Sequence, residues 1–213
     1  MQTITRRRLL LALGLTRIGG AVAAPSRSIS ASRPAETGIA SWYGYPYHGR
    51  RAADGEIYDM EKLTAAHRTL RFNTRVRVVN LSNARAVNVR ITDRGPFVDG
   101  RIIDLSKAAA RTIDLLHTGI TRVRVEVINA PAALLEDRFG VQVGAFEEQA
   151  NAERCLEEMR SRYGAARLAV RDGENALWRV QVGSMPSQER ARALASRIRQ
   201  ESGQNVFLVR IDP

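Results

Sequence analysis

Asp93 and Asp104 are the two residues of this sequence best suited to acid–base chemistry. Asp93 ends an alternating apolar segment, Asp104 follows the apolar pair Ile102 and Ile103, and a charged turn with glycine and proline, residues 94–100, joins them. Such a turn needs a strand on each side, so both carboxylates would face each other across a hairpin on a rigid scaffold, where catalytic groups usually lie. The alternative is that each aspartate only caps a turn or the following helix.

A carboxyl group that donates a proton near neutral pH must first keep that proton, which requires burial or a like-charged neighbour. Two aspartates held together would raise each other's affinity for a proton. We therefore expect one of the pair to serve as acid and base and the other to tune it, with Asp93 as the acid.

Period-two alternation between residues 38 and 128 predicts the short, half-buried strands that must position these aspartates. Valine or isoleucine alternates with charged residues or asparagine along residues 76–78, 87–91 and 122–127. Ser106 precedes a lysine and three alanines, which predicts one short helix with Ser106 as its N-cap. Several short strands and one brief helix favour a small β-barrel.

The remaining part of the chain, residues 138–213, contains an internal repeat. Val-Gln-Val-Gly-Ala-Phe at residues 141–146 returns as Val-Gln-Val-Gly-Ser-Met at residues 180–185, and a helix-period segment and another strand follow each copy. Two such units predict a ferredoxin-like or RNP-like α+β domain of order βαββαβ, with two helices on one face of a four-stranded sheet. Cys155 lies on the apolar stripe of the first helix, so we interpret it as a small core residue.

Strand alternation predicts which side chains of the repeat face away from the helices. The valines point toward the helices, and the open face then carries Gln142, Gly144, Phe146, Arg179, Gln181 and Gly183. Amide and guanidinium donors on a flat face suit the hydroxyl and acetamido groups of a sugar polymer, although single-stranded RNA and an ordinary solvated face fit the same pattern. Trp178 falls on the inward side, which predicts core packing. Contact with a sugar remains a second hypothesis for this residue.

The N-terminal 23 residues have the pattern of an export signal. A basic segment at residues 5–8 precedes an apolar run at 9–15, which is too short to span a bilayer, and Ala-Val-Ala at 21–23. The paired arginines also fit a twin-arginine signal. Residues 24–37 are rich in Ser, Pro and Arg and are expected to form a flexible linker, and residues 129–137 a second, short one.

The charge of the chain favours an anionic partner. Cleavage after Ala23 removes four of the 33 basic residues and none of the 22 acidic ones, so the formal net charge falls from +11 to +7. Export argues against nucleic acid as that partner and leaves acidic lipid and an anionic cell-wall polymer. No cysteine lies near the cleavage site, so no lipid anchor is expected, and no Cys/His spacing indicates zinc.

Residues 38–128 contain, in order, the motifs Ala40-Ser41-Trp42-Tyr43-Gly44, His48-Gly49-Arg50, Ala53-Asp54-Gly55-Glu56-Ile57-Tyr58, Leu63-Thr64-Ala65-Ala66-His67-Arg68-Thr69-Leu70, Thr92-Asp93-Arg94-Gly95-Pro96-Phe97 and Gly100-Arg101-Ile102-Ile103-Asp104-Leu105-Ser106. Through these motifs the segment resembles the rare lipoprotein A family throughout, and the repeat resembles a SPOR domain, a module that binds septal peptidoglycan. The resemblance implies a six-stranded double-psi β-barrel, related to expansins, that cleaves peptidoglycan strands without stem peptides.

The resemblance also implies roles for individual residues. Glu56, His67 and Asp93 match positions that the family treats as functional, and Asp104 matches the acidic residue of the expansin and endoglucanase relatives. Glu56 would raise the pKa of the aspartates or orient a sugar. His67 would hydrogen-bond a carboxyl or stabilise developing charge, with a purely structural role as the alternative.

We therefore expect a periplasmic, septal lytic transglycosylase that cuts the MurNAc–GlcNAc bond of denuded glycan without a metal or other cofactor. One carboxyl can serve as acid and then base, because the muramic 6-hydroxyl replaces an external water. The residues expected to bind substrate in the repeat are Gln142, Arg179, Gln181 and Trp178. The alternative is a non-catalytic, expansin-like protein of cell division that only binds peptidoglycan.

Overall fold

The computed structural model describes residues 35–132, 136–170 and 177–212. The expected export signal and all but the last three residues of the first expected linker lie outside the described residues. Residues 35–37 belong to the first strand, which pairs Glu36 with Val125 and so begins before the expected domain start at residue 38. No helix among the described residues is long and apolar enough to cross a membrane.

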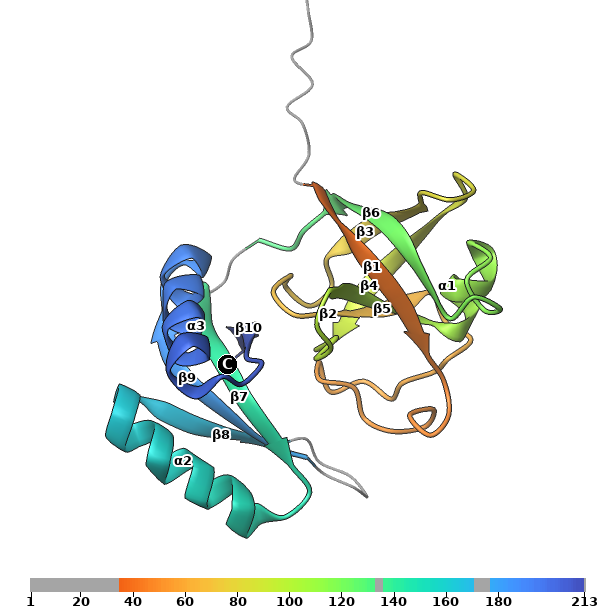
Figure 1. The fold of residues 1–213 in the computed structure, drawn as a ribbon. Helices are drawn as coiled ribbons and strands as arrows, with labels where there is room; N and C mark the ends of the chain where they lie inside the picture. The colour runs from red at the N-terminus through yellow and green to blue at the C-terminus, as the bar shows by residue number, and fades with distance from the viewer. Residues whose placement is uncertain (1–34, 133–135, 171–176, 213) are drawn as a thin grey trace, which may run out of the picture. The chain divides into compact units, whose positions relative to one another are not determined.

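Six strands of the first part close into a barrel, as the alternation predicted, and a short helix follows the fifth strand (Figure 1). These elements are β1 (Ala35–Tyr43), β2 (Thr64–His67), β3 (Arg75–Asn80), β4 (Ala86–Asp93), β5 (Arg101–Ser106), α1 (Lys107–Thr112) and β6 (Ile120–Asn129). Ser106 is the N-cap of α1, because its side chain accepts a hydrogen bond from the backbone N–H of Ala109 at 3.2 Å. The predicted cap is therefore confirmed.

The strand order around the barrel is β1-β5-β2-β4-β3-β6, and β6 pairs with β1 to close it. The β1–β5 and β2–β4 pairs are parallel, and the other pairs are antiparallel. Strand β2 consequently lies between β4 and β5. The expected hairpin that joins Asp93 to Asp104 is therefore wrong: residues 94–100 cross over β2 and connect two strands that are not neighbours.

The interior of the barrel is filled by small and β-branched residues from every strand. Its fully buried members include Ala40, Ala65, Val76, Val123 and Ile91. Alternate residues of each strand point the other way, as period-two patterning requires. Trp42 packs against this core, which leaves its neighbours Ser41 and Tyr43 on the outer face of β1.

The second part is a four-stranded antiparallel sheet with two helices, in the predicted βαββαβ order. Its elements are β7 (Arg138–Phe146), α2 (Gln149–Tyr163), β8 (Ala166–Val170), β9 (Trp178–Met185), α3 (Gln188–Ser202) and β10 (Phe207–Ile211), and the strand order is β10-β7-β9-β8. One core cluster contains Val141 and Val180 from the sheet with Leu156 and Ile198 from the helices, so both helices cover one face.

Cys155 packs against the core of this second part, as predicted. Burial raises the pKa of its thiol, and the carboxylate of Glu158 raises it further. A thiol with a raised pKa is a weak nucleophile at neutral pH, which agrees with a packing role.

Phe146 does not lie on the open face of the sheet, contrary to the prediction from alternation. The pairing of β7 with β9 shifts by one residue between Gln142 and Gly144, so the side chains beyond this bulge change face. Phe146 pairs with Trp178, and both pack against the helix-side core. Of the two roles predicted for Trp178, the structure shows core packing.

Candidate active site

Asp93 and Asp104 flank Ala66 in one row that crosses the outer face of the barrel. Ala66 is paired with Asp93 on β4 and with Asp104 on β5, and Asp104 is paired with Ser41 on β1. Two strand spacings separate the backbones of the two aspartates, which is about 10 Å. Ala66 lies between them on β2 and is 4% exposed.

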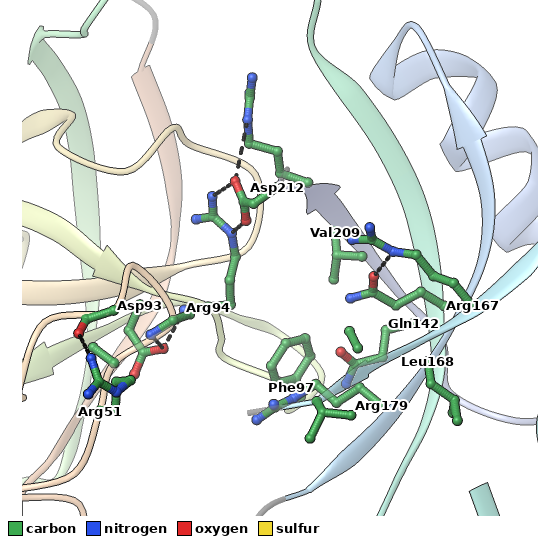
Figure 2. A pocket seen from close by; sticks show the side chains of 17 residues that line it. Arg51, Asp93, Arg94, Phe97, Gln142, Arg167, Leu168, Arg179, Val209 and Asp212 are labelled. Carbon is green, nitrogen blue, oxygen red and sulfur yellow. Dashed lines mark hydrogen bonds and ion pairs between the residues drawn. The ribbon is translucent and has the colours of Figure 1, made fainter. Parts of the chain in front are cut away.

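Asp93 reaches this row through a bulge at the end of β4. Ala65 pairs with Ile91 and Ala66 with Asp93, so Thr92 is the extra residue. Asp93 is 4% exposed, and its Oδ1 accepts hydrogen bonds from the backbone N–H groups of Ala53 at 3.2 Å and Arg94 at 2.7 Å. Two amides therefore fix the direction of a buried carboxyl group, which Figure 2 shows with Arg94.

Asp104 is held by charged and hydroxyl donors. The Ser41 hydroxyl donates to its Oδ1 at 2.5 Å, and Nη2 of Arg101 donates to both oxygens at 2.9 Å. Ser41 lies on β1, so the carboxylate is directed away from β2 and Asp93. Asp104 and Asp93 do not share a proton in this arrangement, because carboxyl groups that do so lie about 3 Å apart.

Gly95 carries the chain over β2 between the two aspartates. A Cβ added to it would lie 3.8 Å from the Cβ of Ala66 and 4.0 Å from Oδ2 of Asp104, and its φ angle is 148°. This backbone conformation is essentially restricted to glycine. The crossover thus brings main chain close to Asp104 at a point where a side chain would be strained.

Glu56 lies outside this row. Its carboxylate forms a bidentate pair with Arg90, with Nη2–Oε2 at 2.6 Å and Nη1–Oε1 at 2.8 Å, and half of its side chain is exposed. The hydrogen bonds from Arg90 lower the pKa of Glu56 below its usual value, so this carboxyl is ill suited to keep a proton. The structure thus ties Glu56 to the outer surface of β4.

Asp54 is an acidic residue near Asp93 that sequence reasoning missed. Its backbone N–H donates to the carbonyl of Thr92 at 3.1 Å, and its side chain is 6% exposed. Burial raises the pKa of Asp54, and the carboxylates of Glu56 and Asp93 add to that increase. The only sequence signal was its place in the Ala53-Asp54-Gly55-Glu56 motif, which a simple turn explains equally well.

His67 is buried at the end of β2 with its ring directed away from the row. It pairs with Ile103, one position from the Ala66–Asp104 pair, so its side chain lies on the other face of the sheet. Its Nδ1 accepts the backbone N–H groups of Thr69 and Leu70 at 3.2 and 3.1 Å, so the ring proton belongs on Nε2, which lies 3.2 Å from Oε2 of Glu36. This hydrogen bond lowers the pKa of Glu36.

Arg94, which follows β4, hydrogen-bonds the end of β2 and the loop after it. Its Nη1 donates to the carbonyls of His67 at 3.0 Å and Leu70 at 2.9 Å, and its guanidinium lies 3.8 Å from the ring centroid of Phe72. These contacts give the residue a structural role next to Asp93.

On the face of the sheet away from the helices, a row crosses all four strands, with polar residues on β7, β9 and β8 and a phenylalanine on β10. Phe207 pairs with Gln142, Gln142 with Gln181, and Gln181 with Arg167, whose Nε donates to Oε1 of Gln181 at 3.0 Å. Arg179 lies two residues from Gln181 on β9 and therefore on the same face. Gln142 is 4% exposed, and its Oε1 is buried without a hydrogen-bond partner among the described residues.

No group of three or more His, Cys, Asp or Glu side chains in the described part of the chain is arranged to hold a metal ion. The candidate groups at the barrel are therefore carboxyl, hydroxyl and guanidinium groups and backbone amides.

Comparisons with known proteins agree with both halves of this description. Residues 35–125 match the family model described as a lytic transglycolase, and residues 136–210 match that of the SPOR domain. Together with the closed six-stranded barrel and the four-stranded sheet, they define a double-psi β-barrel protein with a C-terminal SPOR domain.

Three relatives bear the name endolytic peptidoglycan transglycosylase RlpA. That of Neisseria meningitidis serogroup A is 40% identical over 164 residues, which cover 73% of this chain and 68% of the relative. That of Helicobacter pylori J99 is 34% identical over 196 residues, 78% of this chain and 62% of the relative. That of Campylobacter jejuni is 57% identical over 91 residues, 43% of this chain and 33% of the relative. The chain belongs to the RlpA family.

The lengths of the relatives differ from the length matched here. The chain spans 33% of the Campylobacter jejuni relative and 62% of the Helicobacter pylori relative, less than two thirds in each case.

Proposed function

We propose that the protein is an endolytic lytic transglycosylase that cleaves the MurNAc–GlcNAc bonds of peptidoglycan. The observation that carries this proposal is the buried carboxyl of Asp93, which two backbone amides hold in the same row of the barrel as Asp104. The names of the RlpA relatives support the same reaction and substrate.

In the proposed reaction Asp93 acts first as acid and then as base. Its proton passes to the glycosidic oxygen as the bond from that oxygen to C1 of MurNAc breaks, which leaves a 4-hydroxyl on GlcNAc. The 6-hydroxyl of the same MurNAc attacks C1 and gives its proton to the Asp93 carboxylate. The products are a 1,6-anhydro end and a GlcNAc end, and Asp93 recovers its proton.

Asp104 has a different part in this proposal. With both oxygens held by Ser41 and Arg101, it is a fixed, charged acceptor that orients sugar hydroxyl groups and stabilises positive charge at C1. In this proposal Asp54, rather than Asp104, is the acidic neighbour of Asp93, since it is buried, close to Thr92 and electrostatically coupled to Asp93. In this proposal Glu56 has a positioning role, because its ion pair with Arg90 holds the connection between β1 and β2 against β4.

The SPOR domain would hold the same polymer on its open face. Gln142, Gln181 and Arg179 offer amide and guanidinium groups to hydroxyl, acetamido and carboxylate groups of the glycan. Removal of the stem peptide from MurNAc leaves a lactyl carboxylate, which suits a chain of net positive charge. We therefore propose denuded glycan as the substrate and the septal periplasm as the location, which the expected export signal supports.

Product analysis tests the reaction directly. The full chain is incubated with sacculi from which an amidase has removed the stem peptides, and the soluble products are examined by mass spectrometry. We expect fragments with 1,6-anhydro-MurNAc ends, and none with the Asp93→Asn variant. Reducing ends instead of anhydro ends would indicate hydrolysis and contradict the proposed mechanism.

A non-catalytic, wall-binding protein is the second candidate. It is favoured by the ion pairs that engage Glu56 with Arg90 and Asp104 with Arg101, which leave few carboxyl groups for proton transfer. Intact glycan strands after long incubation, together with binding of the protein to the sacculi, would support this candidate over the enzyme.

A further inference from the structure

We propose that Tyr45 and Tyr47 form a sugar-stacking subsite, here called the tyrosine platform, that binds a pyranose ring of the glycan beyond the Asp93–Asp104 row. This inference rests on the proposed function for the identity of the ligand. It assigns a binding role to the connection between β1 and β2, which carries none of the candidate catalytic aspartates of the row.

The platform continues the face of β1 that holds the row. Ser41 pairs with Asp104 and Tyr43 pairs with Ser106, and the core residue Trp42 between them points inward. Ser41 and Tyr43 therefore lie on the same outer face, and their Cα atoms are about 7 Å apart along the strand. A polymer that passes Asp104 and Ser41 along β1 reaches the tyrosines next.

A ladder of aromatic rings supports the platform from beneath. The buried ring of Tyr58 stacks on Tyr43 with centroids 4.3 Å apart and planes 14° apart, and Tyr47 meets Tyr43 edge-on at 6.0 Å. Burial raises the pKa of Tyr58, and the nearby carboxylate of Asp93 raises it further. The ladder thus begins close to Asp93 and ends at the surface.

The backbone of the platform is fixed as well. Tyr47 N–H donates to the carbonyl of Gly44 at 2.8 Å, and its own carbonyl accepts the N–H of Arg50 at 3.0 Å. The ring of Tyr45 meets His48 edge-on at 5.7 Å, and Nδ1 of His48 accepts the N–H of Met60 at 3.2 Å. A ligand that binds here does not have to order the loop first, which lowers the entropic cost of binding.

The two rings are nevertheless exposed to water. Tyr45 is 76% exposed and Tyr47 is 46% exposed, the first being the most exposed large apolar side chain among the described residues. Rings that are held in place and left uncovered match a ligand with an apolar face and a hydroxylated edge, because tyrosine has both. The C–H face of a pyranose and its equatorial hydroxyl groups have this chemistry.

Binding measurements with an inactive chain test the platform apart from catalysis. In an Asp93→Asn background, Tyr45→Ala and Tyr47→Ala should each weaken binding of soluble peptide-free glycan strands about three- to tenfold, as for loss of one aromatic contact. Tyr45→Phe should bind like the parent, because the ring remains. The matched control is Leu81→Ala, an exposed apolar residue, 45% exposed, in the β3–β4 turn.

Each outcome has a separate meaning for the two proposals. Unchanged affinity in both alanine variants overturns the platform, whether or not the wild-type chain cleaves glycan. Loss of affinity in Leu81→Ala as large as in Tyr45→Ala also overturns it, because the effect is then not local. Weakened binding in the alanine variants of a chain whose wild type yields no anhydro products supports the platform and refutes the proposed reaction.

Discussion

Asp93 and Asp104 occupy the same row but differ in what surrounds their carboxyl groups. Asp93 is buried and bound by backbone amides, whereas Asp104 is paired with Arg101 and Ser41. An arginine and a hydroxyl group hold the Asp104 carboxyl in one orientation, and we propose that Asp93 rather than Asp104 exchanges a proton with the ligand. Residue type and spacing identified the pair, but its division of labour follows from these partners.

Substitution of the two aspartates should therefore have unequal effects. Asp93→Asn removes the acid and should lower the rate of anhydro-product release by about 100-fold or more, within the range for loss of general acid catalysis. Asp104→Asn keeps an acceptor for Ser41 and should lower it less. The rates are measured by mass spectrometry of released fragments.

Asp99→Asn is the matched control for these two variants, because Asp99 is an exposed acid on the crossover loop. It should cleave like the wild type. Full activity of Asp93→Asn beside an inactive Asp104→Asn would reverse the assignment of the two roles.

Glu56 should stabilise the fold in a pH-dependent manner. Arg90 lowers its pKa below the ordinary 4.5, so the folded state favours the charged carboxylate. This stability is fully present above pH 4.5 and is lost as the pH falls through the lowered pKa. Glu56→Gln should therefore lower the free energy of unfolding near neutral pH by at most about 1 kcal/mol, since the pair is partly exposed.

Urea denaturation of the wild type and Glu56→Gln at several pH values measures this difference. The two curves should converge in acid, because both side chains are then neutral. Glu153→Gln, on the exposed side of α2, is the control and should change stability little. A difference that stays constant down to acid pH would contradict the role of the Glu56–Arg90 pair.

At the scale of elements, two bulges decide which face functional side chains occupy. The bulge at Thr92 places Asp93 opposite Ala66, and the bulge between Gln142 and Gly144 turns Phe146 into the core. Alternation is counted from one residue to the next, so a single inserted residue reverses every later assignment on that strand.

Gly144 is the residue that makes the second bulge compatible with Phe146. A Cβ added there would lie 2.6 Å from Cε2 of Phe146, closer than packed atoms approach. Gly144→Ala should therefore lower the free energy of unfolding by about 1–3 kcal/mol, as overpacking does. Thermal or urea denaturation measures it.

Ser184→Ala, an exposed position on β9, is the control and should change stability by no more than about 0.5 kcal/mol. Equal stability of Gly144→Ala and the wild type would mean that Phe146 moves aside at no cost, and that its inward position is not specified by Gly144.

At the scale of the whole molecule, a barrel with a candidate site and a sheet with a polar row are joined in one chain. Gln142 pairs with Gln181 in this row, and in the proposed complex its amide offers a donor and an acceptor to the hydroxyl and acetamido groups of the glycan. Gln142→Ala in the full chain should therefore weaken binding to denuded sacculi about three- to tenfold, the effect of one lost hydrogen bond.

A sedimentation assay of the protein with denuded sacculi measures this affinity. Gln204→Ala, an exposed glutamine outside the row, is the control and should bind like the wild type. If the Gln142→Ala and Gln204→Ala variants bind equally well, the row is an ordinary solvated face, which was the alternative left open by the pattern.

The sequence by itself determined the elements and the candidate residues of this protein. Period-two valines, Ser106 as a cap and the repeated Val-Gln-Val-Gly segment are local signals, because each depends on neighbours along the chain. The tertiary structure alone decided that β2 lies between β4 and β5, that Asp104 faces Ser41 and that Glu56 pairs with Arg90. These contacts join residues far apart in the sequence, and closure of the barrel sets their partners through strand order and register, which no local pattern encodes.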